Sequence, residues 1–237
     1  MPNLDQKIIE NLAAIRERMA QAAISAGRSP DDIQLVAVTK YVGLPETAAL
    51  LEAGCRDLGE SRPQQLWEKA DHPELAAAHW HLIGHLQRNK VRRTLPLVEL
   101  IHSVDSLRLL ETVNEAAEQL GQRKRVLLEV NCSGEAEKHG LTTSSLMEML
   151  SELPALRHVE VCGLMTMAAR SGGEVVAGKN FSALRQLRDV AQQSAPPEVT
   201  LTELSMGMSH DFEVAIREGA TIVRVGSLLF EGVGLRE

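Results

Sequence analysis

The stretch Leu204–Gly232, LSMGMSHDFEVAIREGATIVRVGSLLFEG, reads as strand, glycine-rich turn, short helix, strand and Gly-Ser turn. Ser209 stands where the N-cap of a helix over Phe212–Glu218 belongs. Thr221–Val225 is β-branched except for Arg224, which predicts a buried strand that carries one charge. This order of elements is typical of an α/β protein.

Both predicted strands of this stretch are followed by glycine and hydroxyl residues. Gly226-Ser227 follows the second strand directly, and Ser209 lies in the turn after the first. Backbone N–H groups and hydroxyls at two neighbouring strand ends can bind an anion, most naturally a phosphate. Side chains alternate along a strand, so Arg224 shares a face with Gly226 and points to the same place. The alternative is that Arg224 pairs with a buried carboxylate.

In the rest of the chain, predicted strands and helices alternate in units of about 25 to 30 residues, which is the spacing of βαβ units. The predicted strands are 33–39, 56–59, 79–84, 100–104, 125–131, 159–166, 202–206 and 221–225. Eight such units most simply close into a single (β/α)8 TIM barrel. An open doubly wound sheet lacks support, because no G-x-G-x-x-G follows the first strand. We therefore expect one domain over residues 1–237, with an outer packing helix at 3–27.

Composition excludes several classes of protein. Hydrophobic residues make up 44% of the chain and aromatic ones only 3%, so the core must consist of Val, Leu, Ile and Ala. The formal charge of −7 argues against nucleic acid or an anionic membrane as the main partner. Cys55, Cys132 and Cys162 are widely spaced, which favours a reducing cytoplasm. The first residues lack a signal-peptide pattern, and no apolar run is long enough to span a bilayer.

Lys40 follows the first predicted strand. In a closed barrel the first and eighth strands are neighbours, and functional sites lie at the C-terminal strand ends, so Lys40 stands beside Arg224. Burial and a like charge would both lower the pKa of Lys40. A neutral amine can attack an aldehyde to form a Schiff base. A phosphate site next to such a lysine predicts pyridoxal 5′-phosphate (PLP) as cofactor. An arginine at the pyridine nitrogen would leave that nitrogen unprotonated and make the ring a weak electron sink.

At this point the sequence resembles the YggS/PROSC family of PLP homeostasis proteins, from about residue 33 to 232. The motifs that carry the resemblance are VAVTK at 36–40, WHLIGHLQRNK at 80–90, NCS at 131–133 with KHG at 138–140, GLM at 163–165 and the closing stretch. The resemblance implies a barrel similar to the N-terminal domain of alanine racemase, with PLP bound covalently to Lys40. It also implies that Arg224 lies at the pyridine nitrogen and that the phosphate is held near Ser205, Ser209, Gly226 and Ser227.

Further cofactor-binding candidates lie near these motifs. Met206 is next to Ser205 at a strand end. The family commonly reads Phe-Gly-Glu-Asn where this chain reads Leu58-Gly59-Glu60-Ser61, so the shorter hydroxyl of Ser61 replaces an amide close to the cofactor. His81 is a candidate for packing near the cofactor ring, with an ordinary core position as the alternative.

Other polar segments give weaker indications of chemistry. His79, His81 and His85 could suggest a metal, but no cysteine or carboxylate cluster completes a set, so we expect none. Lys138 could help to receive or release PLP by exchanging Schiff bases. The glycine-rich segment 168–178 is a candidate for a mobile lid, with ordinary surface disorder as the alternative.

Two functions are compatible with these features. The first is a PLP-binding protein of vitamin B6 homeostasis that holds PLP and supplies or buffers it for apo PLP-enzymes. The second is a PLP-dependent racemase, which needs a proton acceptor on each face of the substrate. In alanine racemase a second domain provides a tyrosine for this purpose. Here the only tyrosine, Tyr41, is expected to point away from Lys40 if the first strand continues, and residue 237 directly follows the barrel. A histidine or cysteine could serve as the second base instead. We expect the carrier, as a cytoplasmic monomer without catalytic activity of its own.

Overall fold

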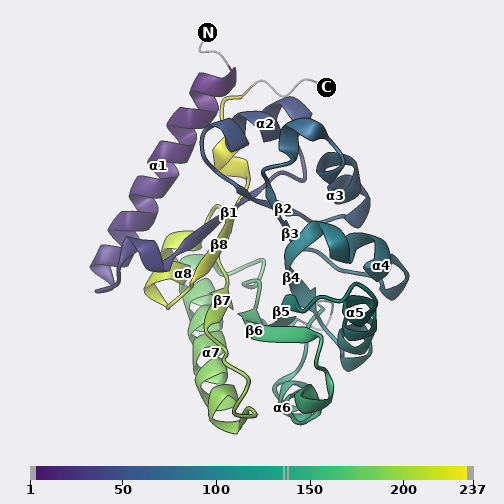
Figure 1. Cartoon of the computed structure of the whole chain (residues 1–237). Helices are drawn as coiled ribbons and strands as arrows, with labels where there is room; N and C mark the ends of the chain where they lie inside the picture. The colour runs from purple at the N-terminus through teal and green to yellow at the C-terminus, as the bar shows by residue number, and fades with distance from the viewer. Residues whose placement is uncertain (1–3, 136, 138, 234–237) are drawn as a thin grey trace.

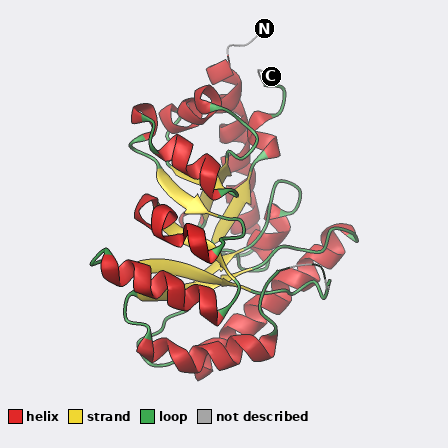
Figure 2. Ribbon diagram, turned by 90° about the vertical axis from the view of Figure 1, so that its right-hand side faces the viewer, coloured by secondary structure: helices red, strands yellow, loops and turns green. Residues whose placement is uncertain are grey.

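The computed structural model describes residues 4–135, 137 and 139–233. Eight parallel strands pair in sequence order and close into a barrel, with helices between them on the outside (Figures 1 and 2). The strands are β1 (Gln34–Val38), β2 (Asp57–Glu60), β3 (His79–Leu82), β4 (Val98–Val104), β5 (Lys124–Glu129), β6 (Val159–Met165), β7 (Glu203–Ser205) and β8 (Ile222–Val225). The predicted (β/α)8 barrel is confirmed.

Helices or short helical turns lie between successive strands, as the predicted alternation requires. The α-helices are α1 (Leu4–Ser25), α2 (Leu44–Glu52), α3 (Pro63–Ala70), α4 (Val91–Thr94), α5 (Leu107–Gln119), α6 (Thr143–Glu152), α7 (Gly173–Ser194) and α8 (Phe212–Arg217). Short 3-10 turns are η1 (Pro30–Asp32), η2 (Pro73–Leu75), η3 (Arg88–Lys90), η4 (Leu95–Leu97), η5 (Leu153–Ala155) and η6 (Ser227–Phe230). As predicted, α1 packs on the outside, where it contacts α2 and α8 (Figure 1).

Apolar side chains form two layers. One lies between the sheet and the helices, and a smaller cluster fills the barrel interior with Val36, Leu100, Leu127, Cys162, Met165 and Ile222. Gly163 shows how closely β6 and β7 pack, because a Cβ atom there would overlap the carbonyl oxygen of Glu203. A larger residue at this position would force the two strands apart.

One local prediction is wrong. Ser209 is not the N-cap of α8, since Asp211 occupies that position and its carboxylate accepts from the Met208 backbone N–H at 2.6 Å. The segment 168–178, a candidate for a mobile lid, includes the start of α7, which begins at Gly173.

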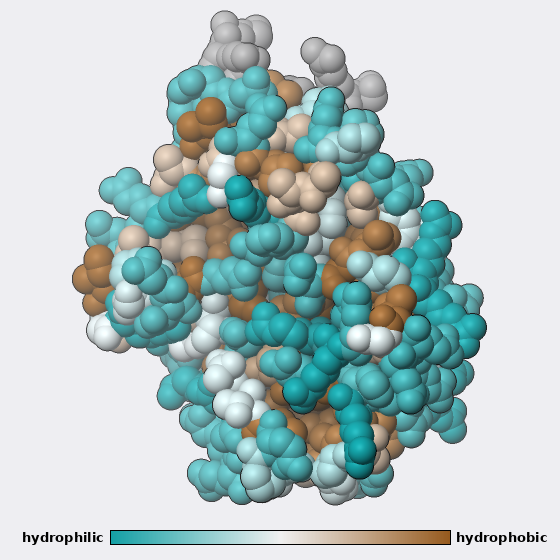
Figure 3. All heavy atoms as spheres, viewed as in Figure 1, coloured by the Kyte–Doolittle hydropathy of each residue, from teal (hydrophilic) through white to brown (hydrophobic). Residues whose placement is uncertain are grey.

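Hydrophilic side chains cover most of the face that Figure 3 shows, and hydrophobic ones are exposed in separate patches. Within the described part of the chain, no helix combines the length and apolar character needed to cross a membrane.

Candidate functional site

Lys40 lies just beyond the C-terminal end of β1, beside β8. These two strands pair with Val36 aligned to Arg224, as expected for a closed barrel. The strand does not continue past Thr39, whose carbonyl accepts from the Val42 N–H at 3.1 Å in a turn. The condition under which Tyr41 would point away from Lys40, a continued strand, is therefore not met, and Lys40 Nζ lies 4.8 Å from the centroid of the Tyr41 ring.

Arg224 is a buried cation that hydrogen-bonds to neutral oxygens. Its side chain donates to Ser205 Oγ and, at 3.0 Å, to the carbonyl of Thr166. Among the described residues no carboxylate lies within ion-pair distance of it, so the alternative of a close carboxylate partner is not what the fold adopts. Burial lowers the pKa of Arg224 to about 10, and the charges of Glu129 and Asp211 oppose this shift.

A chain of hydrogen bonds crosses the barrel interior below Arg224. Ser205 Oγ lies 2.8 Å from His102 Nδ1, and His102 Nε2 lies 3.0 Å from His81 Nδ1. His81 Nε2 then lies 3.3 Å from Asp57 Oδ1, at the N-terminal end of β2. His81 is thus separated from Arg224 by His102 and Ser205. The structure places it in a buried polar chain, with its hydrogen-bonding partners inside the barrel.

The two ends of this chain have fixed roles. A guanidinium can only donate, and an ionised carboxylate can only accept. Ser205 therefore accepts from Arg224, and His81 donates from Nε2 to Asp57. Burial holds the pKa of His102 well below its usual range, and the charges of His81 and Arg224 lower it further. A neutral His102 uses one ring nitrogen as donor and the other as acceptor in its contacts with Ser205 and His81.

We predict that His102 makes the protein less stable in mild acid. A depressed pKa means that His102 binds a proton in the unfolded chain before it does so in the folded one, so stability falls as pH drops below about 6.5. Urea unfolding at neutral and mildly acidic pH measures this loss. In His102→Gln, which keeps polar atoms but does not titrate, the loss should be smaller. An equal loss in both proteins would contradict the assignment.

The turns after β7 and β8 lie against each other. Ser209 Oγ accepts from the Gly226 backbone N–H at 3.2 Å, which joins the two predicted anion-binding turns. Gly207 enables the first turn, because its φ of +91° favours glycine and a Cβ there would lie 2.5 Å from Ala215 Cβ. Ser227 is exposed at the start of η6.

Two other predicted cofactor contacts, Met206 and Ser61, form no hydrogen bond with Lys40 or Arg224 in the described part of the chain. The Met206 side chain is fully buried in the layer between sheet and helices, and its backbone N–H donates to Ile222 O at 3.1 Å. Ser61 is half-buried in the loop after β2, which touches the loop after β3, because a Cβ on Gly84 would overlap the carbonyl oxygen of Ser61. Lys138 lies outside the described residues.

A buried ion pair next to Lys40 was not predicted from the sequence. Lys69 Nζ lies 2.6 Å from Glu60 Oε1 and donates to the Thr39 carbonyl at 2.8 Å. Thr39 Oγ1 also donates to Glu60 Oε1, at 2.7 Å. These contacts fix the residue that precedes Lys40. One signal was available: Lys69 follows the buried Leu66 by three positions in α3 and so shares its inward face.

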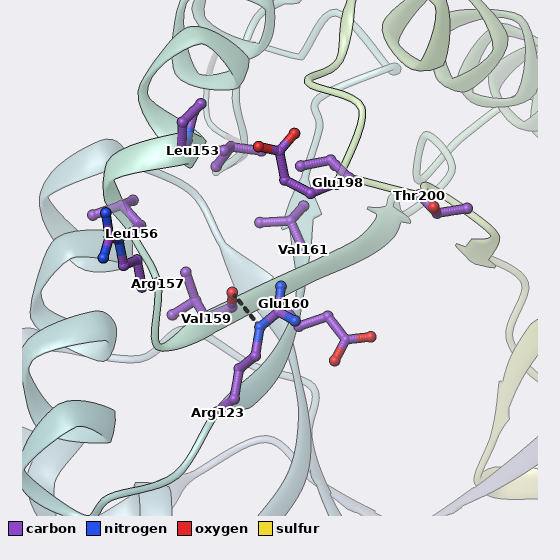
Figure 4. A pocket seen from close by; sticks show the side chains of 11 residues that line it. Arg123, Leu153, Leu156, Arg157, Val159, Glu160, Val161, Glu198 and Thr200 are labelled. Carbon is purple, nitrogen blue, oxygen red and sulfur yellow. Dashed lines mark hydrogen bonds between the residues drawn. The ribbon is translucent and has the colours of Figure 1, made fainter.

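The opposite end of the barrel carries the pocket shown in Figure 4. It is lined by residues at the start of β6, by η5 and by the segment before β7. Arg123 Nε donates to the Val159 carbonyl there at 3.2 Å. The lining combines Arg123 and Arg157 with Glu160 and Glu198, so no single charge dominates. Lys40 and Arg224 lie at the other end of their strands.

Comparisons with known proteins agree with this fold. The family model described as alanine racemase, N-terminal domain, matches residues 10–233. A curated relative from Aquifex aeolicus is 38% identical over 221 residues, covering 93% of this chain and 96% of the relative. One from Bos taurus is 37% identical over 234 residues, covering 92% of this chain and 85% of the relative. Both are named pyridoxal phosphate homeostasis protein.

Solved structures extend the comparison. PipY from Synechococcus elongatus, with PLP bound, superposes with a TM-score of 0.83 at 35% identity, covering 94% of this chain and 99% of that one. An alanine racemase from Clostridium difficile has a TM-score of 0.72 at 17% identity, which shows the shared fold alone; the match covers 93% of this chain and 56% of the racemase. The chain therefore belongs to the alanine racemase N-terminal domain family and, within it, to the group of pyridoxal phosphate homeostasis proteins.

Proposed function

We propose that this chain is a single-domain PLP carrier, which holds PLP covalently on Lys40 at the barrel mouth and supplies or buffers it for apo PLP-enzymes. We place it in the cytoplasm, as a monomer. The observation that carries the proposal is the buried guanidinium of Arg224, which has no close carboxylate among the described residues and lies one strand away from Lys40. Relatives named pyridoxal phosphate homeostasis protein support the same conclusion.

The residues at the mouth fit the chemical groups of PLP. The phosphate needs N–H and hydroxyl donors. Ser209 lies between the last two strands, and because its Oγ accepts from the Gly226 N–H, its own O–H can donate to a phosphate. Glycine at position 226 also leaves room beside β1, because a Cβ there would lie 3.3 Å from Val38. The pyridine nitrogen needs one donor. A guanidinium has five N–H donors, and Arg224 uses two in its hydrogen bonds to Ser205 and Thr166.

The bound cofactor would supply an aldehyde that condenses with amines, and the chain's own residues determine its reactivity. Lys40 provides the amine. Arg224, held in place by Ser205 and Thr166, donates to the pyridine nitrogen and keeps the proton on the guanidinium. With a pKa of about 10, Arg224 remains charged at neutral pH. The ring is then a weak electron sink, which suits storage of the cofactor better than turnover of amino acids.

A transfer experiment tests the supply role. Protein loaded with PLP is mixed with an apo PLP-enzyme in the presence of a phosphatase that destroys free PLP. We expect the loaded protein to restore enzyme activity under this trap, while the same amount of free PLP does not. Equal restoration by both donors would contradict the supply role. Binding itself is followed separately by absorbance, so a protein that binds PLP but does not transfer it is recognised.

A further inference from the structure

The loops after β3, β4 and β5 bring together three metal-ligating side chains at the barrel mouth: His85, Asp105 and His139. Asp105 Oδ2 lies 3.3 Å from His85 Nδ1 and 3.9 Å from His139 Nδ1. One ligand atom from each residue lies within 4.8 Å of the others. The two imidazole rings are stacked, with centroids 4.7 Å apart and planes inclined by 18°.

The donor set has a definite chemical preference. Two imidazole nitrogens and one carboxylate oxygen are the ligands that zinc takes in open sites, where water completes a tetrahedron. Zinc–ligand bonds of about 2.0–2.2 Å place neighbouring ligand atoms about 3.3 Å apart. His85 and Asp105 already have this separation. The side chain of His139 is 64% exposed, so its ring has room to close the remaining distance.

The surroundings of the cluster suit a cation. The two stacked imidazoles lie beside one carboxylate, and a metal ion takes imidazole as a neutral ligand. Glu129, at the end of β5, is buried nearby, and burial together with the charge of Asp105 raises its pKa. A cation bound at Asp105 would offset part of this repulsion. Ser106 Oγ donates to Asp105 Oδ1 at 3.3 Å and so supports the orientation of the carboxylate.

We propose that His85, Asp105 and His139 form a binding site for one divalent transition-metal ion of the zinc class, with one coordination position left for water. Bound metal would join three loops that border the mouth, including the loop after β5. The site could not be recognised from spacing along the chain, because its ligands follow three different strands. The proposal is independent of PLP binding, since neither Lys40 nor Arg224 takes part.

Isothermal titration calorimetry with zinc sulfate tests the site on the full chain, expressed without a histidine tag. We expect binding of one ion per chain, both with and without PLP. His85→Ala and His139→Ala should each weaken it at least about tenfold. Both positions are exposed, so these variants are expected to fold, which thermal unfolding on the same samples checks.

His158→Ala is the matched control, because His158 is a half-buried histidine beside a single carboxylate, with Nε2 3.8 Å from Glu118 Oε1. Its affinity for zinc should equal that of the wild type. Cobalt in place of zinc adds a spectroscopic measurement, since tetrahedral coordination by nitrogen and oxygen gives visible absorption bands. Absence of one-to-one binding in the wild type, or unchanged affinity in both ligand variants, would overturn the proposal.

Discussion

Lys40→Ala should abolish covalent capture of PLP while leaving the barrel folded. Lys40 is half-buried at the end of β1, and its ammonium lies over the exposed ring of Tyr41, so its removal leaves no cavity in the core. Arg224 and the Ser209–Gly226 contact remain in place. The variant should therefore still bind the phosphate and ring non-covalently, but borohydride reduction should attach no cofactor to it.

The measurement is the mass of the reduced protein, followed by peptide mapping of the modified lysine. Lys40→Arg is the first control, because it keeps the positive charge but cannot condense with an aldehyde, and it should also remain unlabelled. Lys90→Ala is the second, as a lysine in the short turn η3 after β3, and it should be labelled like the wild type. Label on Lys40→Ala at the wild-type level would refute the assignment of Lys40.

The fold could be predicted well because its signals are local. Ile222–Val225, for example, is a short run rich in β-branched residues that lies between Thr221 and Gly226. The alternation of such runs with helices leaves few topologies other than a closed barrel. Barrel closure then places Lys40 beside Arg224, although one lies near the start of the chain and the other near its end.

Side-chain partners could not be predicted in the same way, since they depend on register and on rotamers. The chain of hydrogen bonds from Asp57 through His81 and His102 to Ser205 joins four strands that are far apart in the sequence. For His81 an interior position was one of the two alternatives, but nothing in the sequence indicates that its partners are another histidine and a carboxylate. The N-cap of α8 was misplaced because the turn after Gly207 is longer than the minimal one, so Asp211 caps the helix instead.

Lys69→Met should cost about 3–5 kcal/mol of the free energy of unfolding, the range found when one partner of a buried ion pair is removed. The carboxylate of Glu60 is fully buried, and its Oε2 has no hydrogen-bond partner among the described residues. Without Lys69, Glu60 would keep only the Thr39 hydroxyl as a donor to Oε1. Urea unfolding measures the loss. Lys179→Met in α7 is the matched control and should change stability by less than about 0.5 kcal/mol, because Lys179 is exposed.

The double variant Glu60→Gln with Lys69→Met separates the charge from the packing. If the cost arises from an unpaired buried carboxylate, neutralising Glu60 should recover most of the lost stability. No recovery would mean that Lys69 stabilises through its contacts alone.

Lys69 also donates to the carbonyl of Thr39, which directly precedes Lys40. That bond is lost in both variants, so covalent capture of PLP should be slowed to a similar extent in both, even where stability has returned. Stability and capture would then respond to different parts of the same buried cluster, because the charge balance involves Glu60 whereas the position of Lys40 depends on the backbone of Thr39.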